Sequence, residues 1–450
     1  MLFVVLAAMI VACAVAAGIA IRRPALLIAF LLSVAAILRF DSDIGDTVGG
    51  QSNLSSLWLL VLILCCLIAL PRLGIFRTRP TTPEICYLIF LAWCGLESSI
   101  ADDLAFALRM YLKVLYPLLA MCLARLAIRH AATAAQLLRW ITGVAAIAYL
   151  PLGGLTTRFA PFITMTAAPF LWPFGAFADY AAMMALVALV CWRLFRRWYY
   201  LGLAFLLGVN GLLASIRTGV LATVVGISVF LLLEFRRKGL PLVVGMYFAV
   251  ALAAVALPGI RDKTFMDLDD AEFSKVALDP GSIDVDRIDS SGRTSVWKTV
   301  LDRFFWPSPL TGSGLGATQA WFYHGNYGNL MVEHSEYVRL LADTGIVGLG
   351  LYLLIVLSSM RSLWAIYRSA SHPMIRHLSL LGLCVFPVYL VCMGFDNVLN
   401  YVLPAEQFPF ALTGAAIGLH QALNQPSQGF HNGDEWSTTL LAADSGQSDV

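Results

Sequence analysis

The stretch LFVVLAAMIVACAVAAGIAIRR, Leu2 to Arg23, decides the fold class of this chain. Residues 2–21 carry no charged side chain, and a run of about this length can span a bilayer as a helix. Arg22 and Arg23 end the run, as basic residues do on the cytoplasmic side of a membrane. No basic segment precedes the run and no small-residue cleavage site follows it, so we expect a membrane helix and not a removed signal.

Runs of the same kind recur along the whole chain. Of its 450 residues, 59% are hydrophobic and 13% are charged, which is far too apolar for a soluble domain of this size. The sequence therefore predicts an all-α polytopic membrane protein with about 12–13 transmembrane helices. The candidate spans, of which the second and the last are weak by length, are residues 2–21, 24–40, 54–71, 84–100, 104–124, 138–152, 174–192, 199–213, 216–235, 240–258, 346–363, 378–396 and 406–422. All nine cysteines fall within these spans, so no disulfide framework is indicated.

Basic residues assign a side to each loop. If the side after the first span is called inside, the inside loops carry Arg22, Arg23, Arg72, Arg77, Arg79, Arg125, Arg129, Arg193, Arg196, Arg197, Arg236, Arg237, Lys238, Arg361, Arg368 and Arg376. The short outside loops instead carry the acidic segments DSDIGD, residues 41–46, and ESSIADD, residues 97–103. This alternation places the N-terminus outside and the C-terminal tail inside.

The spans divide the chain into four parts. We expect a transmembrane bundle of about ten helices at 1–258, a large outside loop at 259–345, the last transmembrane helices at 346–422 and a disordered tail at 423–450. The first half of the loop is acidic and poor in aromatic residues, which predicts loose order. Its second half has Val296, Val300 and Phe304 at helical spacing, followed by a proline break. The run Gly312-x-Gly314-x-Gly316 then predicts a sharp turn, since it lacks the strand–turn–helix context of a nucleotide site.

Several cations lie near the outside ends of the predicted spans. Arg109 and Lys113 are four residues apart and so share one helix face. They need a counter-anion, which could be Asp102, Asp103 or an anionic ligand, or else they reach the outer interface by snorkelling.

Three further arginines lie on the same side. Arg217 begins a predicted span beside Ser215 and Thr218. The free backbone N–H groups at this helix end and the guanidinium of Arg217 favour binding of an anion. Alternatively, Arg217 anchors the helix at the membrane interface. Arg158 and Arg293 are either ligands of the same kind or ordinary loop residues. Together these cations fit a polyanion at the membrane surface, such as a lipid diphosphate.

A polar segment, EHSEYVRLLADTGIVG, interrupts the apolar pattern at Glu333 to Gly348. His334 is either a catalytic group or the polar end of a membrane helix. Ser335 resembles an N-cap hydroxyl or hydrogen-bonds the histidine ring. Gly345 allows either close approach of helices or a helix break.

These motifs together resemble the O-antigen ligase and Wzy-type polysaccharide polymerase superfamily. The block from His334 and Ser335 through Val338 to Gly345 is similar to its H-S/N-x-x-L…G signature, with valine where leucine is usual. The topology is similar too, with the large outside loop before the last helices.

Two upstream elements extend the resemblance, which covers roughly residues 211–354. SIRTG, around Arg217, resembles the serine–arginine motif of the family. SSGRTSVW, with Arg293 and Trp297, and PLTGSGLGA resemble the elements that precede its histidine. Ligases and polymerases share the pattern, so it does not separate them.

The resemblance implies a GT-C-like fold and a metal-independent, inverting glycosyltransferase of the bacterial inner membrane, with a periplasmic N-terminus and a cytoplasmic C-terminus. The donor would be a saccharide on undecaprenyl diphosphate, attacked by a hydroxyl of the acceptor. We favour polymerisation of an exopolysaccharide or O-antigen, because polymerases are more diverse and more numerous; transfer of a finished chain to lipid A–core is the alternative. A transporter or flippase of lipid-linked oligosaccharide is an alternative of another class, but it predicts midplane charges and repeat symmetry that are not visible.

The resemblance also implies roles for the residues. His334 would be the base or would orient the acceptor. Arg217 and Arg293 would bind diphosphate or sugar, and the same anion pocket would draw on Arg109, Lys113 and Arg158. Ser335, Gly345 and Trp297 would support the motif. We expect no cofactor and no metal, and as partners the lipid-linked oligosaccharide, membrane lipids and other polysaccharide-export proteins, but no nucleic acid.

Overall fold

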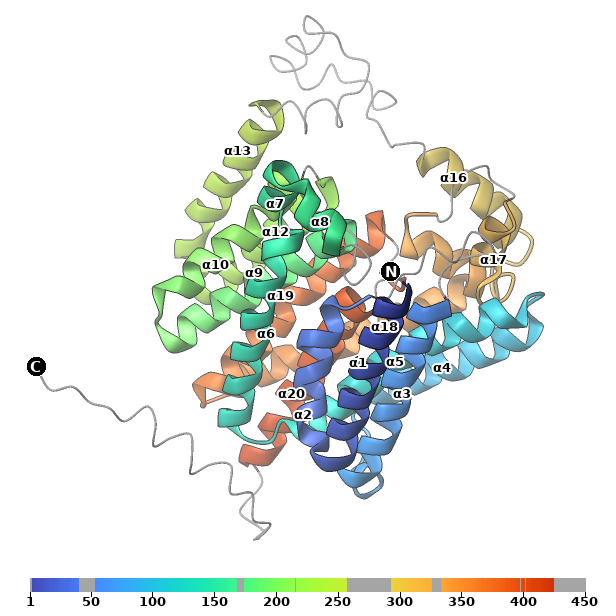
Figure 1. The fold of residues 1–450 in the computed structure, drawn as a ribbon, viewed down its shortest axis with the longest axis horizontal. Helices are drawn as coiled ribbons and strands as arrows, with labels where there is room; N and C mark the ends of the chain where they lie inside the picture. Colours follow the sequence, from blue (N-terminus) through green and yellow to red (C-terminus); the bar gives the residue numbers. More distant parts are fainter. Residues whose placement is uncertain are drawn as a thin grey trace, which may run out of the picture.

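The computed structural model describes residues 2–39, 53–167, 174–214, 216–256, 293–325, 333–396, 398–400 and 402–424, and these residues form helices and no strand (Figure 1). The predicted all-α polytopic class is confirmed. The acidic segment at 41–46, the acidic half of the large loop at 259–292, Ser215 and the tail from 425 lie outside the described residues. The division into four parts therefore stays a prediction.

Each predicted span coincides with a helical segment. In the first half of the chain these are α1 (Leu2–Arg22), α2 (Pro24–Phe30) with the π-helical η1 (Leu31–Ala35), α3 (Asn53–Arg72), α4 (Thr82–Ile100), α5 (Leu104–Ala127) and α6 (Ala131–Leu152). In the second half they are α9 (Phe174–Phe195), α10 (Trp198–Gly208) with α11 (Asn210–Leu213), α12 (Arg217–Phe235), α13 (Leu240–Ala256), α18 (Glu336–Ser369), α19 (Pro373–Phe395) and α20 (Gln407–Asn424).

Shorter elements connect these helices. They are η3 (Ile75–Arg77), α7 (Gly154–Phe159), α8 (Pro161–Ala167), η4 (Arg236–Gly239), α16 (Arg293–Val300), the π-helical η7 (Leu301–Phe305), α17 (Ala317–Tyr323) and the π-helical η8 (Val402–Glu406).

Within the described residues, nine helices are long and apolar enough to cross a membrane. This is fewer than the predicted 12–13 for three reasons. Arg217–Leu252 counts as one stretch of 36 residues although it contains two helices, α12 and α13, on either side of the turn η4, and the segments Pro24–Ala35 and Trp198–Leu213 are shorter than a full crossing. The last helix, α20, carries polar residues at both ends.

Contacts between helix ends agree with the predicted alternation of sides. The Arg72 side chain at the end of α3 donates to the Ile21 carbonyl at the end of α1. At the end of α9, Arg193 Nε donates to Glu234 Oε1, near the end of α12, over 2.7 Å. The helix ends that carry the basic residues therefore meet one another, as they must if they share one side of the membrane. Which side faces the cytoplasm stays a prediction.

Two glycines let α20 lie directly against the backbone of α5 in the middle of the bundle. A Cβ at Gly414 would lie 2.9 Å from the carbonyl carbon of Met121, and one at Gly418 would lie 2.8 Å from that of Arg125. Small residues four apart allow this approach between membrane helices. The closely packed helices α5 and α20 therefore form the interior of the bundle, and the other helices pack around them.

The second half of the large loop folds onto the start of α18. Val296 and Val300 of α16 are buried in a cluster with Phe322 of α17 and with Val338 and Ala342 of α18. The helix predicted from the spacing of Val296 and Val300 is confirmed, and the loop is thereby fixed to the segment that carries His334.

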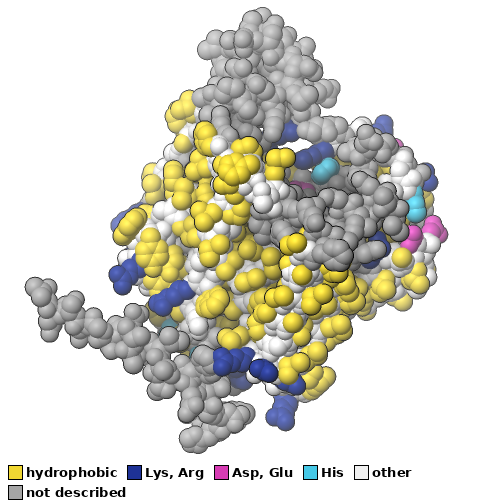
Figure 2. Space-filling view, in the orientation of Figure 1, with side chains coloured by type: hydrophobic (Ala, Val, Ile, Leu, Met, Phe, Trp, Pro, Cys, Tyr) yellow, Lys and Arg dark blue, Asp and Glu magenta, His cyan; other side chains and the backbone are white. Residues whose placement is uncertain are grey.

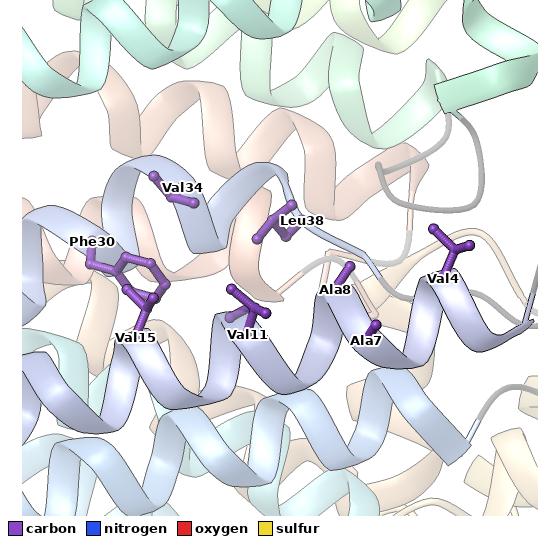
Figure 3. Close-up of a pocket in the computed structure, with 9 residues that line it drawn as sticks. Val4, Ala7, Ala8, Val11, Val15, Phe30, Val34 and Leu38 are labelled. Atoms are coloured by element: carbon purple, nitrogen blue, oxygen red, sulfur yellow. The ribbon is translucent and has the colours of Figure 1, made fainter.

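The surface of the bundle is apolar between two polar ends. Figure 2 shows hydrophobic side chains over the middle of one face, Lys and Arg side chains below them, and charged and histidine side chains above. Between α1 and the segment from α2 to Leu38 runs a groove of about 510 Å³ with an apolar lining. There Val11 and Val15 lie across from Phe30 and Leu38 (Figure 3). Apolar side chains that face outward in this way suit a hydrocarbon environment.

Candidate functional site

A break in α18 defines the geometry of the site. Gly345 has φ 67° and ψ −171° inside this 34-residue helix, a conformation that is essentially restricted to glycine. A Cβ at Gly345 would overlap the carbonyl group of Leu310 and would lie 2.6 Å from Thr311 N. The amides that follow the break, those of Ile346 and Val347, donate to the carbonyls of Pro309 and Leu310 over 2.9 and 3.2 Å. The helix break allowed for Gly345 is confirmed, and it is where the loop docks.

The glycine-rich run of the loop is a sharp turn, as predicted. Gly312, Gly314 and Gly316 have φ of 79°, 98° and 83°. The Asp343 carboxylate accepts hydrogen bonds from Gly316 N at 2.9 Å and from Thr318 N and Oγ1 at 3.0 and 2.9 Å. One buried acid of α18 therefore fixes both the turn and the start of α17.

A second buried group of charges lies one turn earlier on α18. Arg339 pairs with Glu336, and its Nε lies 3.8 Å from Glu333 Oε1. All three side chains are buried. Burial raises the pKa of the Glu333 carboxyl to about 8, although the nearby Arg339 guanidinium acts to lower it. Glu333 therefore retains its proton at neutral pH.

His334 lies on the turn between this group and the loop. Its backbone has φ 53°, and its side chain is 35% exposed. Trp297 Nε1 of α16 donates to the Glu333 carbonyl over 2.8 Å, which holds the turn from the loop side. Ser335 occupies the N-cap position of α18, but its side chain makes no capping hydrogen bond in the described structure. The imidazole is thus presented from a fixed turn in a conformation that non-glycine residues seldom adopt.

Two aspartates that were not predicted from the sequence, Asp396 and Asp179, lie on the side of His334 Nδ1. His334 Nδ1 lies 3.9 Å from Oδ1 of Asp396, the residue that ends α19. Asp396 in turn interacts electrostatically with Asp179 of α9. The Asp179 side chain is 0% exposed. A signal for Asp179 existed in the sequence, because an acid inside an apolar span is by default a candidate functional residue.

Lys113 of α5 has a partner from a distant part of the chain. Its Nζ donates to Asn400 Oδ1 over 2.6 Å, and it interacts electrostatically with Glu336 and Arg339. Lys113 thus belongs to the charged group beneath His334. Its predicted role in binding an anionic ligand stays a prediction.

One of the two acids proposed as counter-ions for α5, Asp103, has another task. Asp103 caps the helix, where its Oδ1 accepts from the Ala105 and Phe106 amides over 3.0 and 3.1 Å. The Arg109 guanidinium instead lies over the Phe106 ring, 5.2 Å from its centroid. The roles predicted for Arg109 therefore also stay open.

The other predicted cations begin α12 and α16 or lie within the short helix α7. Arg217 is the first residue of α12 and Arg293 the first of α16, and both are half-buried and engage neighbouring groups. Arg158 lies on α7, with its side chain outside the described residues. The N-terminal position predicted for Arg217 on its span is confirmed.

Part of this site lies in a segment of the chain that is similar to a known family. Residues 202–353 match the O-antigen ligase family. The segment runs from α10 into the second half of α18, and it contains Arg217, Arg293, Trp297, His334, Ser335 and Gly345. Arg109, Lys113 and Arg158 lie outside it. No curated protein matches the chain.

The match confirms the recognition made from the motifs around His334 and supports an O-antigen ligase- or polymerase-type function in the broad sense. Proteins of this family act on lipid-linked polysaccharide, so the general kind of partner is as expected. Together with the apolar helices, the match identifies a multi-pass membrane protein.

Proposed function

We propose that the protein is an inverting glycosyltransferase of the bacterial inner membrane that polymerises a surface polysaccharide from repeat units on undecaprenyl diphosphate. The observation that carries the proposal is the position of His334 within the O-antigen ligase segment. It lies on a partly exposed turn, with a carboxylate facing its Nδ1. A histidine with one nitrogen toward an acid can offer the other as a base near neutral pH.

The reaction requires one proton transfer and one displacement. The acceptor hydroxyl gives its proton to His334 Nε2 as its oxygen attacks the anomeric carbon from the face opposite the diphosphate. The bond between that carbon and the diphosphate oxygen breaks, and the electron pair leaves with the diphosphate. Asp396 stabilises the imidazolium that forms, and the proton then passes to water. The configuration at the anomeric carbon is inverted.

Negative charge that develops on the diphosphate needs prearranged cations. Arg217 fits this role because it opens α12, where helix N–H groups also point toward an anion. Arg293 opens α16 and lies one helical turn from Trp297, which holds the catalytic turn. In this proposal the loop brings a diphosphate ligand and the base to the same place.

Deletion of the gene and complementation with single variants test the proposal. His334→Ala, Arg217→Ala and Arg293→Ala should each abolish long polysaccharide chains. His324→Ala is the matched control, since this histidine is 60% exposed on the loop and its Nε2 lies 3.7 Å from Asp103 Oδ2. Normal chain lengths in all three variants, with the proteins present in the membrane, would sink the mechanism.

The ligase is the second candidate, and the description of the matched family favours it. The same strains separate the two activities. Single repeat units on lipid A–core in the His334→Ala strain indicate a lost polymerase. Long chains that remain on the lipid carrier indicate a lost ligase.

A further inference from the structure

The chain that follows α19 starts with the acid of the proposed mechanism. Asp396 ends this helix, and its amide donates to the Cys392 carbonyl over 2.8 Å. Residues 398–400 then form a turn. Val398 and Leu399 are 0% and 1% exposed and belong to the hydrophobic core of the bundle. The position of Asp396 therefore depends on how residues 398–400 are held.

Two neighbouring residues of α18 hold the chain on either side of Asp396. Before this acid, Tyr337 Oη donates to the Leu390 carbonyl of α19 over 3.0 Å. After it, the Leu399 amide donates to Glu336 Oε2 over 3.2 Å. Both bonds start from the first turn of α18, so they keep the acid close to the turn that carries the imidazole.

A third attachment comes from α5. Lys113 Nζ donates to Asn400 Oδ1 over 2.6 Å, and both residues are half-buried. The backbone of α5 is itself held at this level, because Tyr87 Oη of α4 donates to the Val114 carbonyl over 3.0 Å. The bond between Lys113 and Asn400 therefore joins the turn after α19 to a fixed part of the bundle.

From these three attachments we infer that Lys113 and Asn400 are positioning residues of the transfer reaction. Their bond holds residues 398–400 against α5 and so keeps Asp396 at the imidazole of His334. The distance between His334 Nδ1 and Asp396 Oδ1 is 3.9 Å. This inference rests on the proposed function of His334. It also gives Lys113 a task other than the binding of an anionic ligand.

The inferred role has a specific kinetic consequence. The acid that faces Nδ1 holds the imidazole ring so that Nε2 points toward the acceptor hydroxyl. This contribution depends on geometry, since a displacement of about 1 Å can slow a reaction by about a hundredfold. The saccharide and the diphosphate take no part in the contact between Lys113 and Asn400. Loss of the contact should therefore lower kcat and leave the affinity for the lipid-linked donor unchanged.

A double-mutant cycle tests the bond. Lys113→Met and Asn400→Leu each remove it with little change in side-chain size. With purified protein in detergent and a synthetic lipid-linked repeat unit, each variant should lower kcat by about tenfold, with KM for the donor within about twofold of wild type. The double variant should have a kcat within about twofold of the slower single variant, because the same bond is lost in all three proteins.

Two further variants exclude a general loss of folding. Asn400→Asp keeps an oxygen that accepts a hydrogen bond from Lys113 and should retain kcat within about threefold of wild type. Leu108→Met is the control on the same helix, because this side chain is 55% exposed, and it should leave kcat and KM unchanged.

Three results would overturn the inference. Losses that multiply in the double variant would mean that Lys113 and Asn400 act separately. Binding of undecaprenyl diphosphate alone that weakens by about tenfold or more in Lys113→Met, but not in Asn400→Leu, would make Lys113 a ligand of the diphosphate. A kcat equal to that of wild type in both single variants would mean that the bond does not position the site.

Hydrogen exchange supplies a readout that does not depend on activity. The Leu399 amide should exchange faster by about tenfold or more in Lys113→Met and in Asn400→Leu, with no change in α5 and α20. Unchanged exchange at Leu399, or faster exchange throughout the bundle, would contradict the inference.

The same variants separate failure of the inference from failure of the proposed function. If His334→Ala is fully active, the proposed function fails, and the exchange at Leu399 still decides whether the bond holds the turn. If His334→Ala is inactive and Lys113→Met has the kcat of wild type, only the inference fails.

Discussion

Replacement of Gly345 by alanine tests whether the break in α18 holds the site together. The backbone there has φ 67° and ψ −171°, and forcing a residue with a Cβ into this region costs about 1–3 kcal/mol. The added Cβ would also overlap the Leu310 carbonyl and approach Thr311 N at 2.6 Å. Because these are backbone atoms held by hydrogen bonds across the break, relief of the overlap costs about 1–3 kcal/mol more. We expect Gly345→Ala to lose about 4 kcal/mol of stability in total.

The assay is thermal unfolding of the purified protein in detergent, with polysaccharide production as a second readout. A loss of this size should lower the melting temperature by roughly 4 °C and abolish the polysaccharide. The control is Gly350→Ala on the same helix, where no atom lies within 4 Å of an added Cβ. This change should stabilise the helix by up to about 1 kcal/mol. Equal melting temperatures and normal polysaccharide in both variants would refute the reasoning.

Three further outcomes follow from other contacts. Gly418→Ala places a Cβ against the Arg125 backbone and should lower the stability by about 2 kcal/mol or more. The control Gly143→Ala has open space around the added Cβ and should lower the stability by less than about 1 kcal/mol. Identical melting curves for the two variants would contradict the close packing of α5 and α20. Glu333 keeps its proton up to about pH 8 when folded, so it favours the folded state at low pH. This contribution, up to about 5 kcal/mol, is lost as pH rises from about 4.5 through 8. Glu333→Gln should reduce the dependence of the melting temperature on pH between about 4.5 and 8. An unchanged dependence on pH would contradict the protonation of Glu333 at neutral pH. Chelation with EDTA should leave transfer activity within about twofold of the untreated enzyme, and a loss that Mg²⁺ restores would refute metal independence.

The helices could be placed from the sequence because a bilayer imposes one length and one composition on each of them. The run at residues 2–21 is sufficient for α1, whatever the rest of the chain does. The number of full crossings was harder to predict, because the runs at Pro24–Ala35 and Trp198–Leu213 form helices shorter than a full crossing.

The contacts around the site were harder to predict from the sequence. Lys113 and Asn400 are far apart in sequence, and so are Asp179 and Asp396; their proximity depends on which helices pack together. Hydropathy contains no information on that choice. The turn at Gly312 could be predicted because a glycine requirement is local, whereas its partner Asp343 could not.

The hydrogen bonds across the break in α18 also decide how this protein can be recombined with its relatives. The natural border between loop and membrane helix, read from hydropathy, is residue 345. A chimera joined there would take residues 309–316 from one parent and their docking partners on α18 from the other. A chimera with one junction at Arg293 and a second junction after Gly348 would instead take the turn, the acids of α18 and His334 from the same parent. A functional chimera therefore has to exchange the docked loop and the start of α18 together, and this segment extends past the predicted border of the membrane.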